Sequence, residues 1–171
     1  MTDAARPPVP LARIDQLGIL VEDLDDSIAA YSELFPVTTW RGYLYTPKTV
    51  PELGYRGEPG EFSFWVALSD LQPQIELIQS VSGPSIYTEW LDRHGPGLHH
   101  VGIITDSLAA DVETLEAQGL VVSQSGRGYG LEGDGGFAYF DSLALLGVVI
   151  ELIEIPKVRR PPDREWVGSR P

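Results

Sequence analysis

Four polar side chains stand inside short segments that otherwise have the apolar character of buried β-strands. Gln16 and His100 begin the runs QLGIL and HVGII, and Glu76 and Glu151 are each flanked by isoleucine and leucine. A carboxylate is costly to bury unless it is paired or bound to a cation, and two carboxylates repel each other unless positive charge lies between them. Two glutamates, an imidazole and an amide oxygen would meet these conditions around a divalent ion. The residue types therefore predict a metal site formed by Gln16, Glu76, His100 and Glu151.

An internal repeat places these residues in two equivalent pairs. The segment that starts at Gln16 (QLGILVEDLDDSIAAYSELF) aligns without gaps on the segment that starts at His100 (HVGIITDSLAADVETLEAQG), and IELIQ around Glu76 aligns on IELIE around Glu151. Amphipathic patterning alone could match the apolar positions, and a lone glutamine or histidine is more often a surface or structural residue than a ligand. Polar residues at equivalent places inside two apolar strands favour a duplication. Its pseudo-twofold axis would bring the four side chains together.

Each copy has the pattern of a strand, a helix and three further strands. After the first strand of each copy, apolar residues recur at spacings of three and four, which is typical of a helix that packs by one face. The predicted fold class is therefore α+β, with two βαβββ modules that form one site on a curved sheet. The further strands are expected at 38–45 and 61–68 in the first copy, and at 120–124 and 136–142 in the second.

The predicted divisions of the chain follow from these elements. They are a flexible leader at 1–10, a first module at 11–80, a connecting helix and loop at 81–97, a second module at 98–156 and a C-terminal tail at 157–171. The connecting helix is expected near 84–94 and is closed by Gly95. The proline-rich ends, 1–10 and 156–171, are expected to be poorly packed.

Composition narrows the chemistry and the partners. The chain of 171 residues has no cysteine, so any metal must be held by oxygen and imidazole. The net charge of −13 repels nucleic-acid phosphates and argues against a nucleic-acid partner. No apolar run approaches the roughly 18 residues of a membrane span, and the N-terminus lacks the apolar core of a signal peptide. We expect a cytoplasmic protein that acts on a small molecule without nucleic-acid or membrane partners, with a homodimer as the assembly.

The segments QLGILVEDLDDSIAAYSELF, GPGLHHVGIITD and GVVIELIE resemble the vicinal oxygen chelate superfamily, which includes glyoxalases, bleomycin-resistance proteins and dioxygenases. The resemblance covers about residues 13–156 and looks closest to methylmalonyl-CoA epimerases. It implies that His100 is the ligand of the histidine pair and that His99 faces the other side in a structural role. Glu151 takes the family's carboxylate position, and Glu76 stands where epimerases commonly carry glutamine. Gln16 departs from the epimerase pattern, which has histidine there, but the resulting set is similar to that of zinc-dependent glyoxalase I.

The resemblance implies a metal-dependent isomerase, epimerase or lyase that acts at a carbon beside a carbonyl through a metal-stabilised enolate. An acyl-CoA is the first substrate class that it suggests, and zinc, cobalt, nickel or manganese are the expected ions. Glu76 or Glu151 would move the proton as the general base. The alternatives are a glyoxalase I-like lyase and a non-catalytic binder of a small ligand. A ring-cleaving dioxygenase is disfavoured, because its iron needs two histidines and one carboxylate, and the third histidine of this chain, His94, lies in the connecting helix.

Three other groups of residues have candidate roles. A general base from the middle of the first module is the epimerase arrangement, and Glu52, Glu58 and Glu61 lie in that region. The segment 125–136, with six glycines in twelve residues, reads equally as a loop that closes over the site or as an exposed linker. The cations that could meet an anionic tail such as that of coenzyme A are Arg41, Lys48, Arg56 and Arg127.

Overall fold

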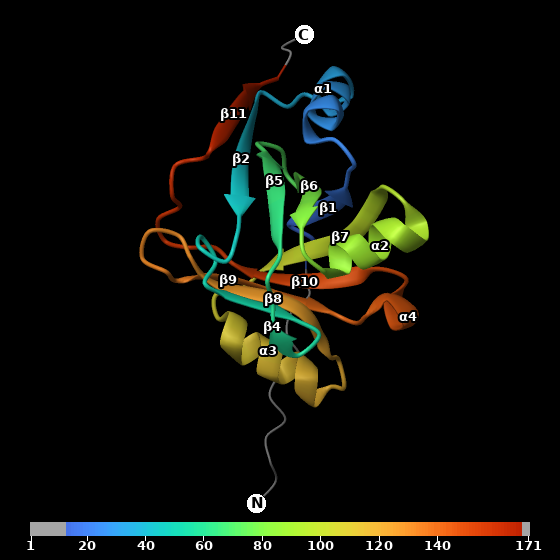
Figure 1. The fold of residues 1–171 in the computed structure, drawn as a ribbon, viewed down its shortest axis with the longest axis vertical. Coiled ribbons are helices and arrows are strands. Elements are labelled where there is room, and N and C mark those ends of the chain that lie inside the picture. Colours follow the sequence, from blue (N-terminus) through green and yellow to red (C-terminus); the bar gives the residue numbers. More distant parts are fainter. Residues whose placement is uncertain (1–12, 169–171) are drawn as a thin grey trace, which may run out of the picture.

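The computed structural model describes residues 13–168, which form one mixed, curled β-sheet with helices packed around it (Figure 1). The leader expected at 1–10 lies outside the described residues. Within them, no helix is both long enough and apolar enough to cross a membrane. The elements in chain order are β1 (Gln16–Leu20), α1 (Leu24–Leu34), β2 (Thr39–Tyr45), β3 (Glu52–Tyr55), β4 (Glu58–Pro59), β5 (Ser63–Ser69), β6 (Gln74–Ser82), α2 (Ile86–His94), β7 (Gly97–Ile104), α3 (Leu108–Ala117), β8 (Val122–Tyr129), β9 (Gly135–Phe140), α4 (Leu143–Leu146), β10 (Val149–Glu154) and β11 (Arg164–Val167).

The order of the strands shows the duplication directly. The described sheet runs β11-β2-β5-β6-β1-β7-β10-β9-β8-β3-β4, and its central eight strands are two mirrored sets of four, β2-β5-β6-β1 and β7-β10-β9-β8. The two sets meet at the antiparallel pair β1–β7. In each set, the strand that comes first along the chain pairs in parallel with the strand that comes last, β1 with β6 and β7 with β10. The predicted α+β class with two repeated modules is confirmed.

The curled sheet separates three apolar clusters. On its outer face α1 covers residues such as Ile75 and Leu77 in the first module, and α3 covers Ile150 and Leu152 in the second (Figure 1). The inner face carries a mainly aromatic cluster to which α2 contributes Ile86 and Tyr87. Strand residues alternate between these faces. Glu76 and Glu151 therefore point inward, between neighbours that point outward.

The outer edges of the sheet are covered by segments that the modules exchange. The β3–β4 hairpin leaves the first module and pairs with β8 of the second, whereas β11 follows the second module and pairs with β2 of the first. Arg56 and Gly57 form the hairpin turn with φ angles of 51° and 85°, the left-handed pair that a two-residue turn with the correct twist requires. The hairpin was not predicted from the sequence. The exchange leaves only β11 and β4, of four and two residues, at the edges, and short edge strands limit unwanted strand pairing.

The strand β11 corrects the expectation of poor packing for residues 156–168, and residues 169–171 lie outside the described residues. Trp166 Nε1 and Arg164 Nη2 donate to Oδ1 of Asp25 in the first turn of α1, at 2.7 and 2.8 Å. The ring of Trp166 lies over Gly42 of β2, where a Cβ would come within 2.5 Å of Cζ3. The C-terminal segment thus fastens α1 and the first module from outside.

The glycine-rich segment 125–136 is also different from its expectation. Most of it belongs to β8 and β9, and only residues 130–134 connect the two strands. The glycines make room for neighbouring side chains, because a Cβ at Gly126 would strike the ring of Phe137 and one at Gly136 would strike Leu108. The segment is neither a lid nor a free linker.

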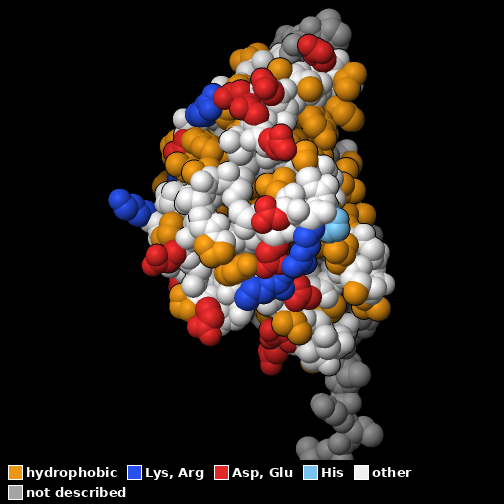
Figure 2. All heavy atoms as spheres, turned by 45° about the vertical axis from the view of Figure 1, so that its right-hand side comes forward, with side chains coloured by type: hydrophobic (Ala, Val, Ile, Leu, Met, Phe, Trp, Pro, Cys, Tyr) orange, Lys and Arg blue, Asp and Glu red, His pale blue; other side chains and the backbone are white. Residues whose placement is uncertain are grey.

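The connecting helix and the surface charge agree with the sequence. Ser85 and Thr88 form a capping box at the start of α2, and Gly95 ends the helix, as expected. Figure 2 shows acidic side chains spread over one face, with some Lys and Arg side chains among them. Apart from a few buried carboxylates such as Glu76 and Glu151, the acidic side chains lie largely on the solvent-exposed surface.

We predict that Trp166→Ala lowers the free energy of unfolding by about 2 kcal/mol, since a fully buried tryptophan costs about 3–5 kcal/mol and this ring is only partly buried. Val167→Ala is the matched control, because Val167 is 89% exposed, and its effect should stay within about 0.5 kcal/mol. Chemical denaturation measures both. Equal effects would show that β11 is not fastened by its tryptophan.

Candidate metal centre

Two rows of residues cross β6, β1, β7 and β10 on the inner face of the sheet. Each row contains one glutamate, one glycine and one neutral candidate ligand. In strand order the rows are Glu76, Gly18, His100, Val149 and Gln74, Gln16, Gly102, Glu151. The pseudo-twofold axis between β1 and β7 exchanges the two rows. The equivalence of Gln16 with His100 and of Glu76 with Glu151, inferred from the repeat, is therefore confirmed in the strand register.

The glycine of each row makes space for the neutral side chain beside it. A Cβ at Gly18 would overlap the imidazole ring of His100, and a Cβ at Gly102 would come within 3.0 Å of both Cβ and Oε1 of Gln16. Such a distance is too short for carbon atoms that do not share a bond. Each neutral side chain can therefore lie flat over the neighbouring strand and reach the axis.

The structure brings all four predicted residues together. Nε2 of His100 lies 3.1 Å from Oε2 of Glu151 and 3.3 Å from Oε2 of Glu76, and the ligand atoms of these three residues lie within 4.8 Å of one another. The carboxamide of Gln16 approaches the same two oxygens at 3.2 and 3.3 Å. All four side chains are buried, with exposed fractions from 0% at His100 to 8% at Glu76.

The donor atoms fit a divalent cation. Nε2 of His100 is buried without a hydrogen bond of acceptable geometry, although two carboxylate oxygens face it, and a buried polar atom without a partner costs about 1–3 kcal/mol. Nε2 of Gln16 donates to Oε1 of Gln74 at 3.0 Å, which turns the Gln16 oxygen toward the glutamates. The reversed carboxamide would instead donate to both carboxylates. With the oxygen inward, three oxygens and one imidazole nitrogen converge, which is a donor set suited to zinc and related ions.

The electrostatics of the group show how strongly it attracts positive charge. Burial disfavours the charged form of His100, but Glu151 and Glu76 outweigh it and raise the pKa of His100 to about 9. Burial raises the pKa of Glu76, with the charge of Glu151 adding to the effect and His100 opposing it. A cation would replace the proton on His100 and neutralise both carboxylates.

The position of His99 differs from the expectation. The pairing of β1 with β7 passes from Gly18–His100 to Ile19–Leu98, so His99 is an extra residue in a β-bulge. A bulge interrupts the alternation of faces, and Nδ1 of His99 consequently lies 3.0 Å from Nδ1 of His100. Burial, followed by the influence of His100, lowers the pKa of His99 to about 2. His99 is therefore neutral, and it contacts the candidate ligand rather than pointing away from it.

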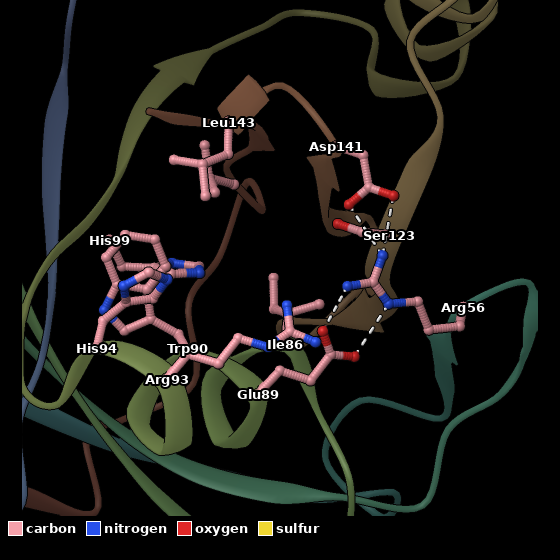
Figure 3. Close-up of a pocket in the computed structure, with 11 residues that line it drawn as sticks. Arg56, Ile86, Glu89, Trp90, Arg93, His94, His99, Ser123, Asp141 and Leu143 are labelled. Atoms are coloured by element: carbon pink, nitrogen blue, oxygen red, sulfur yellow. Dashed lines mark hydrogen bonds and ion pairs between the residues drawn. The ribbon is translucent and has the colours of Figure 1, made fainter. Parts of the chain in front are cut away.

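A cleft beside α2 reaches the far side of His99 (Figure 3). His94, Trp90 and His99 gather at one side of it, and Arg56 lies between Glu89 and Asp141 at the other. Arg56 donates to both carboxylates at 2.6–3.0 Å. These bonds correct the expectation that Arg56 is free to meet an anionic tail.

Comparison with known proteins identifies the family. The Glyoxalase/Bleomycin resistance protein/Dioxygenase superfamily matches residues 15–140. The chain belongs to this superfamily. No curated protein matches it.

Several solved structures share the fold. A hypothetical protein from Bacillus halodurans is 18% identical over 86% of this chain and 97% of its own, with a TM-score of 0.63. A methylmalonyl-CoA epimerase variant from Streptomyces coelicolor, solved with 2-nitronate-propionyl-CoA, is 19% identical over 83% and 96%, with a TM-score of 0.60. The methylmalonyl-CoA epimerase from Mycobacterium tuberculosis is 23% identical over 84% and 89%, also with a TM-score of 0.60.

The other base and anion candidates lie outside the four-residue group. Glu52, Glu58 and Glu61 are exposed, and the first two belong to the exchanged hairpin. The ring of His94, at the end of α2, lies 4.4 Å from the ring of Trp90, with the two planes tilted by 42°. Nε of Arg41 lies 3.8 Å from Oε1 of Glu165 in β11. Neither Gln74 nor the contact made by His99 was predicted from the sequence, because both depend on how the strands pair.

We predict that Gly18→Ala weakens divalent-cation binding at least ~10-fold, the lower end for a disturbed ligand environment, because the new Cβ displaces the His100 ring. Gly54→Ala is the control, since Gly54 lies in β3, outside the four-residue group, and its Cβ would come closest to the flexible end of the Ser125 side chain. Titration with Co²⁺ against a chelating indicator measures the affinity. Unchanged affinity in Gly18→Ala would mean that His100 does not bind through this geometry.

Proposed function

We propose that this superfamily member is a metal-dependent isomerase, of the epimerase kind, or a lyase that acts at a carbon beside a carbonyl. The observation that carries the proposal is the buried group Gln16, Glu76, His100 and Glu151, in which Nε2 of His100 lies between the two carboxylates without a well-aligned hydrogen bond to either. An uncompensated pair of buried carboxylates is unfavourable. A site of this kind is typical of function rather than of stability.

The four residues would hold zinc, cobalt, nickel or manganese. Such a cation would stabilise the negative charge that a carbonyl oxygen acquires when the neighbouring carbon loses a proton. Gln16 and His100 are neutral when they bind a cation, so the two glutamates alone would balance its charge. The site then carries no excess charge that would repel an electron-rich carbonyl oxygen.

Glu76 and Glu151 are the candidates for moving the proton. Both lie on the inner face with the aromatic cluster, where little water competes for a proton. Burial raises the pKa of Glu76 in the chain without a cation, whereas a bound cation would lower it. The glutamate that acts as the base would therefore be one that has loosened from the cation. The carboxylate that lies nearer to the substrate carbon would accept the proton and return it.

Acyl-CoA thioesters are the first substrate class to test, because the neighbours of known activity act on or bind them. At this low identity the likeness to these structures supports the fold alone, and the substrate class is our proposal. The presence of Gln16 favours a second candidate, a glyoxalase I-like lyase, because glutamine with two glutamates and a histidine resembles the ligand set of zinc-dependent glyoxalase I.

We expect the purified chain to bind close to one divalent cation and then to exchange a substrate hydrogen beside a carbonyl for solvent deuterium. Mass spectrometry follows exchange in a panel of acyl-CoA esters, beginning with methylmalonyl-CoA, and of α-keto compounds and the hemithioacetal of methylglyoxal and glutathione. A cation-loaded protein that exchanges hydrogen in none of them would overturn the proposal in favour of a non-catalytic binding protein.

Glu151→Gln should reduce this exchange at least ~10²-fold, the lower end of the effect of a positioned general base, because it removes a negative ligand and a proton acceptor while keeping the shape. Glu154→Gln is the matched control on the same strand. Its side chain faces the other way and accepts from Leu108 N at 2.9 Å, a bond that glutamine can also make. Equal losses in the two variants would point to damage to β10 instead.

A further inference from the structure

Gln16 and His100, the two neutral candidate ligands, differ in the hydrogen bonds that hold their side chains on the side away from the glutamates. Gln16 donates to Gln74 at 3.0 Å, and Gln74 Nε2 donates onward to the carbonyl of Ser69 at 3.0 Å. The pseudo-twofold axis places Val149 at the position equivalent to Gln74. Valine cannot form a hydrogen bond with its side chain, so the second module lacks this support for His100.

The β-bulge supplies the missing partner. It inserts His99 beside His100 and places their Nδ1 atoms 3.0 Å apart. A histidine that binds a cation through Nε2 must carry its proton on Nδ1, and that proton needs an acceptor. His99 can accept it only as the tautomer that is protonated on Nε2.

The aromatic surroundings hold His99 in this position. The rings of Trp90 and Tyr87 from α2 meet it edge to face, at centroid distances of 5.0 and 5.9 Å, and Tyr139 lies 6.0 Å away. The side chain is 2% exposed. Such packing fixes the rotamer of the imidazole, and with it the direction of the hydrogen bond.

We propose that His99 is a positioning residue that accepts the Nδ1 proton of His100 and so presents His100 Nε2 to the cation. This inference rests on the proposed function for its purpose, but the hydrogen bond that it assigns does not require catalysis. The β-bulge of β7 would then have a role, because it brings His99 beside His100. His99 would hold His100 in the second module as Gln74 holds Gln16 in the first.

The test compares His99→Phe, which keeps a planar ring without a nitrogen, with His99→Asn, whose short side chain can still accept a hydrogen bond. We expect His99→Phe to weaken Co²⁺ binding by about 10–100-fold and to change the visible absorption spectrum of bound Co²⁺, with His99→Asn recovering most of both. His94→Phe is the control in the same cleft and should bind Co²⁺ as the unaltered chain does. Thermal unfolding of the cation-free variants separates a loss of positioning from a loss of fold.

Equal Co²⁺ affinity and spectra in His99→Phe and the unaltered chain would overturn the inference, as would equal losses in His99→Phe and His99→Asn. Nitrogen NMR of the imidazoles in the unaltered chain decides independently of any variant. The inference requires a protonated Nδ1 in His100 and an unprotonated Nδ1 in His99. If the unaltered chain binds no Co²⁺ or exchanges no hydrogen, the proposed function fails, and this NMR result still decides the role of His99.

Discussion

The rest of the structure depends on one constraint, which is the burial of two glutamates beside one imidazole on the inner face of the sheet. Without positive charge between them, Glu76 and Glu151 would repel each other and lose their hydration. Strands of the two modules contribute one glutamate each, and the central pair β1–β7 contributes the neutral members. The site therefore exists only when the modules are joined in register, and a one-residue slip of β1 on β7 would turn Gln16 away from it.

The joined modules explain several features that are distant from the group. Gly18 and Gly102 are needed because each neutral side chain crosses the neighbouring strand. The outward-facing neighbours of the glutamates pack under α1 and α3, which holds each carboxylate on the inner face. The hairpin β3–β4 and the strand β11 then connect each module to the outer edge of the other, so that separating the modules would break strand pairing at both ends of the sheet as well as at its centre.

The sequence predicted the repeat, the central strands, the three longer helices and the four clustered residues, because these depend on local periodicity and on equivalence between the copies; the short helix α4 was not predicted. It did not predict the hairpin exchange or β11, since both depend on which edge strand a segment meets in space. The segment around Trp166 has a single aromatic residue among charged ones and prolines, so its pairing with β2 has no local signature. The bulge at His99 was missed for a similar reason, because two histidines in sequence look like ordinary strand alternation until the register against β1 is known. Cation binding by the four residues stays a prediction.

In the chain without a cation, the two glutamates raise the pKa of His100 to about 9, and burial raises the pKa of Glu76. At neutral pH a proton on His100 supplies one positive charge between the glutamates, and protonation of Glu76 becomes easier than for an exposed glutamate. A divalent ion held by these four residues would take the place of the proton on His100 and would supply two positive charges instead of one. A bound ion stabilises the folded state in proportion to the logarithm of its free concentration over its dissociation constant, by about 2.7 kcal/mol at one hundred times that constant. The cation would therefore stabilise the pairing of β1 with β7, on which the positions of its own ligands depend. The duplication supplies the two glutamates, and the strand register brings them to the place where their charges need a cation.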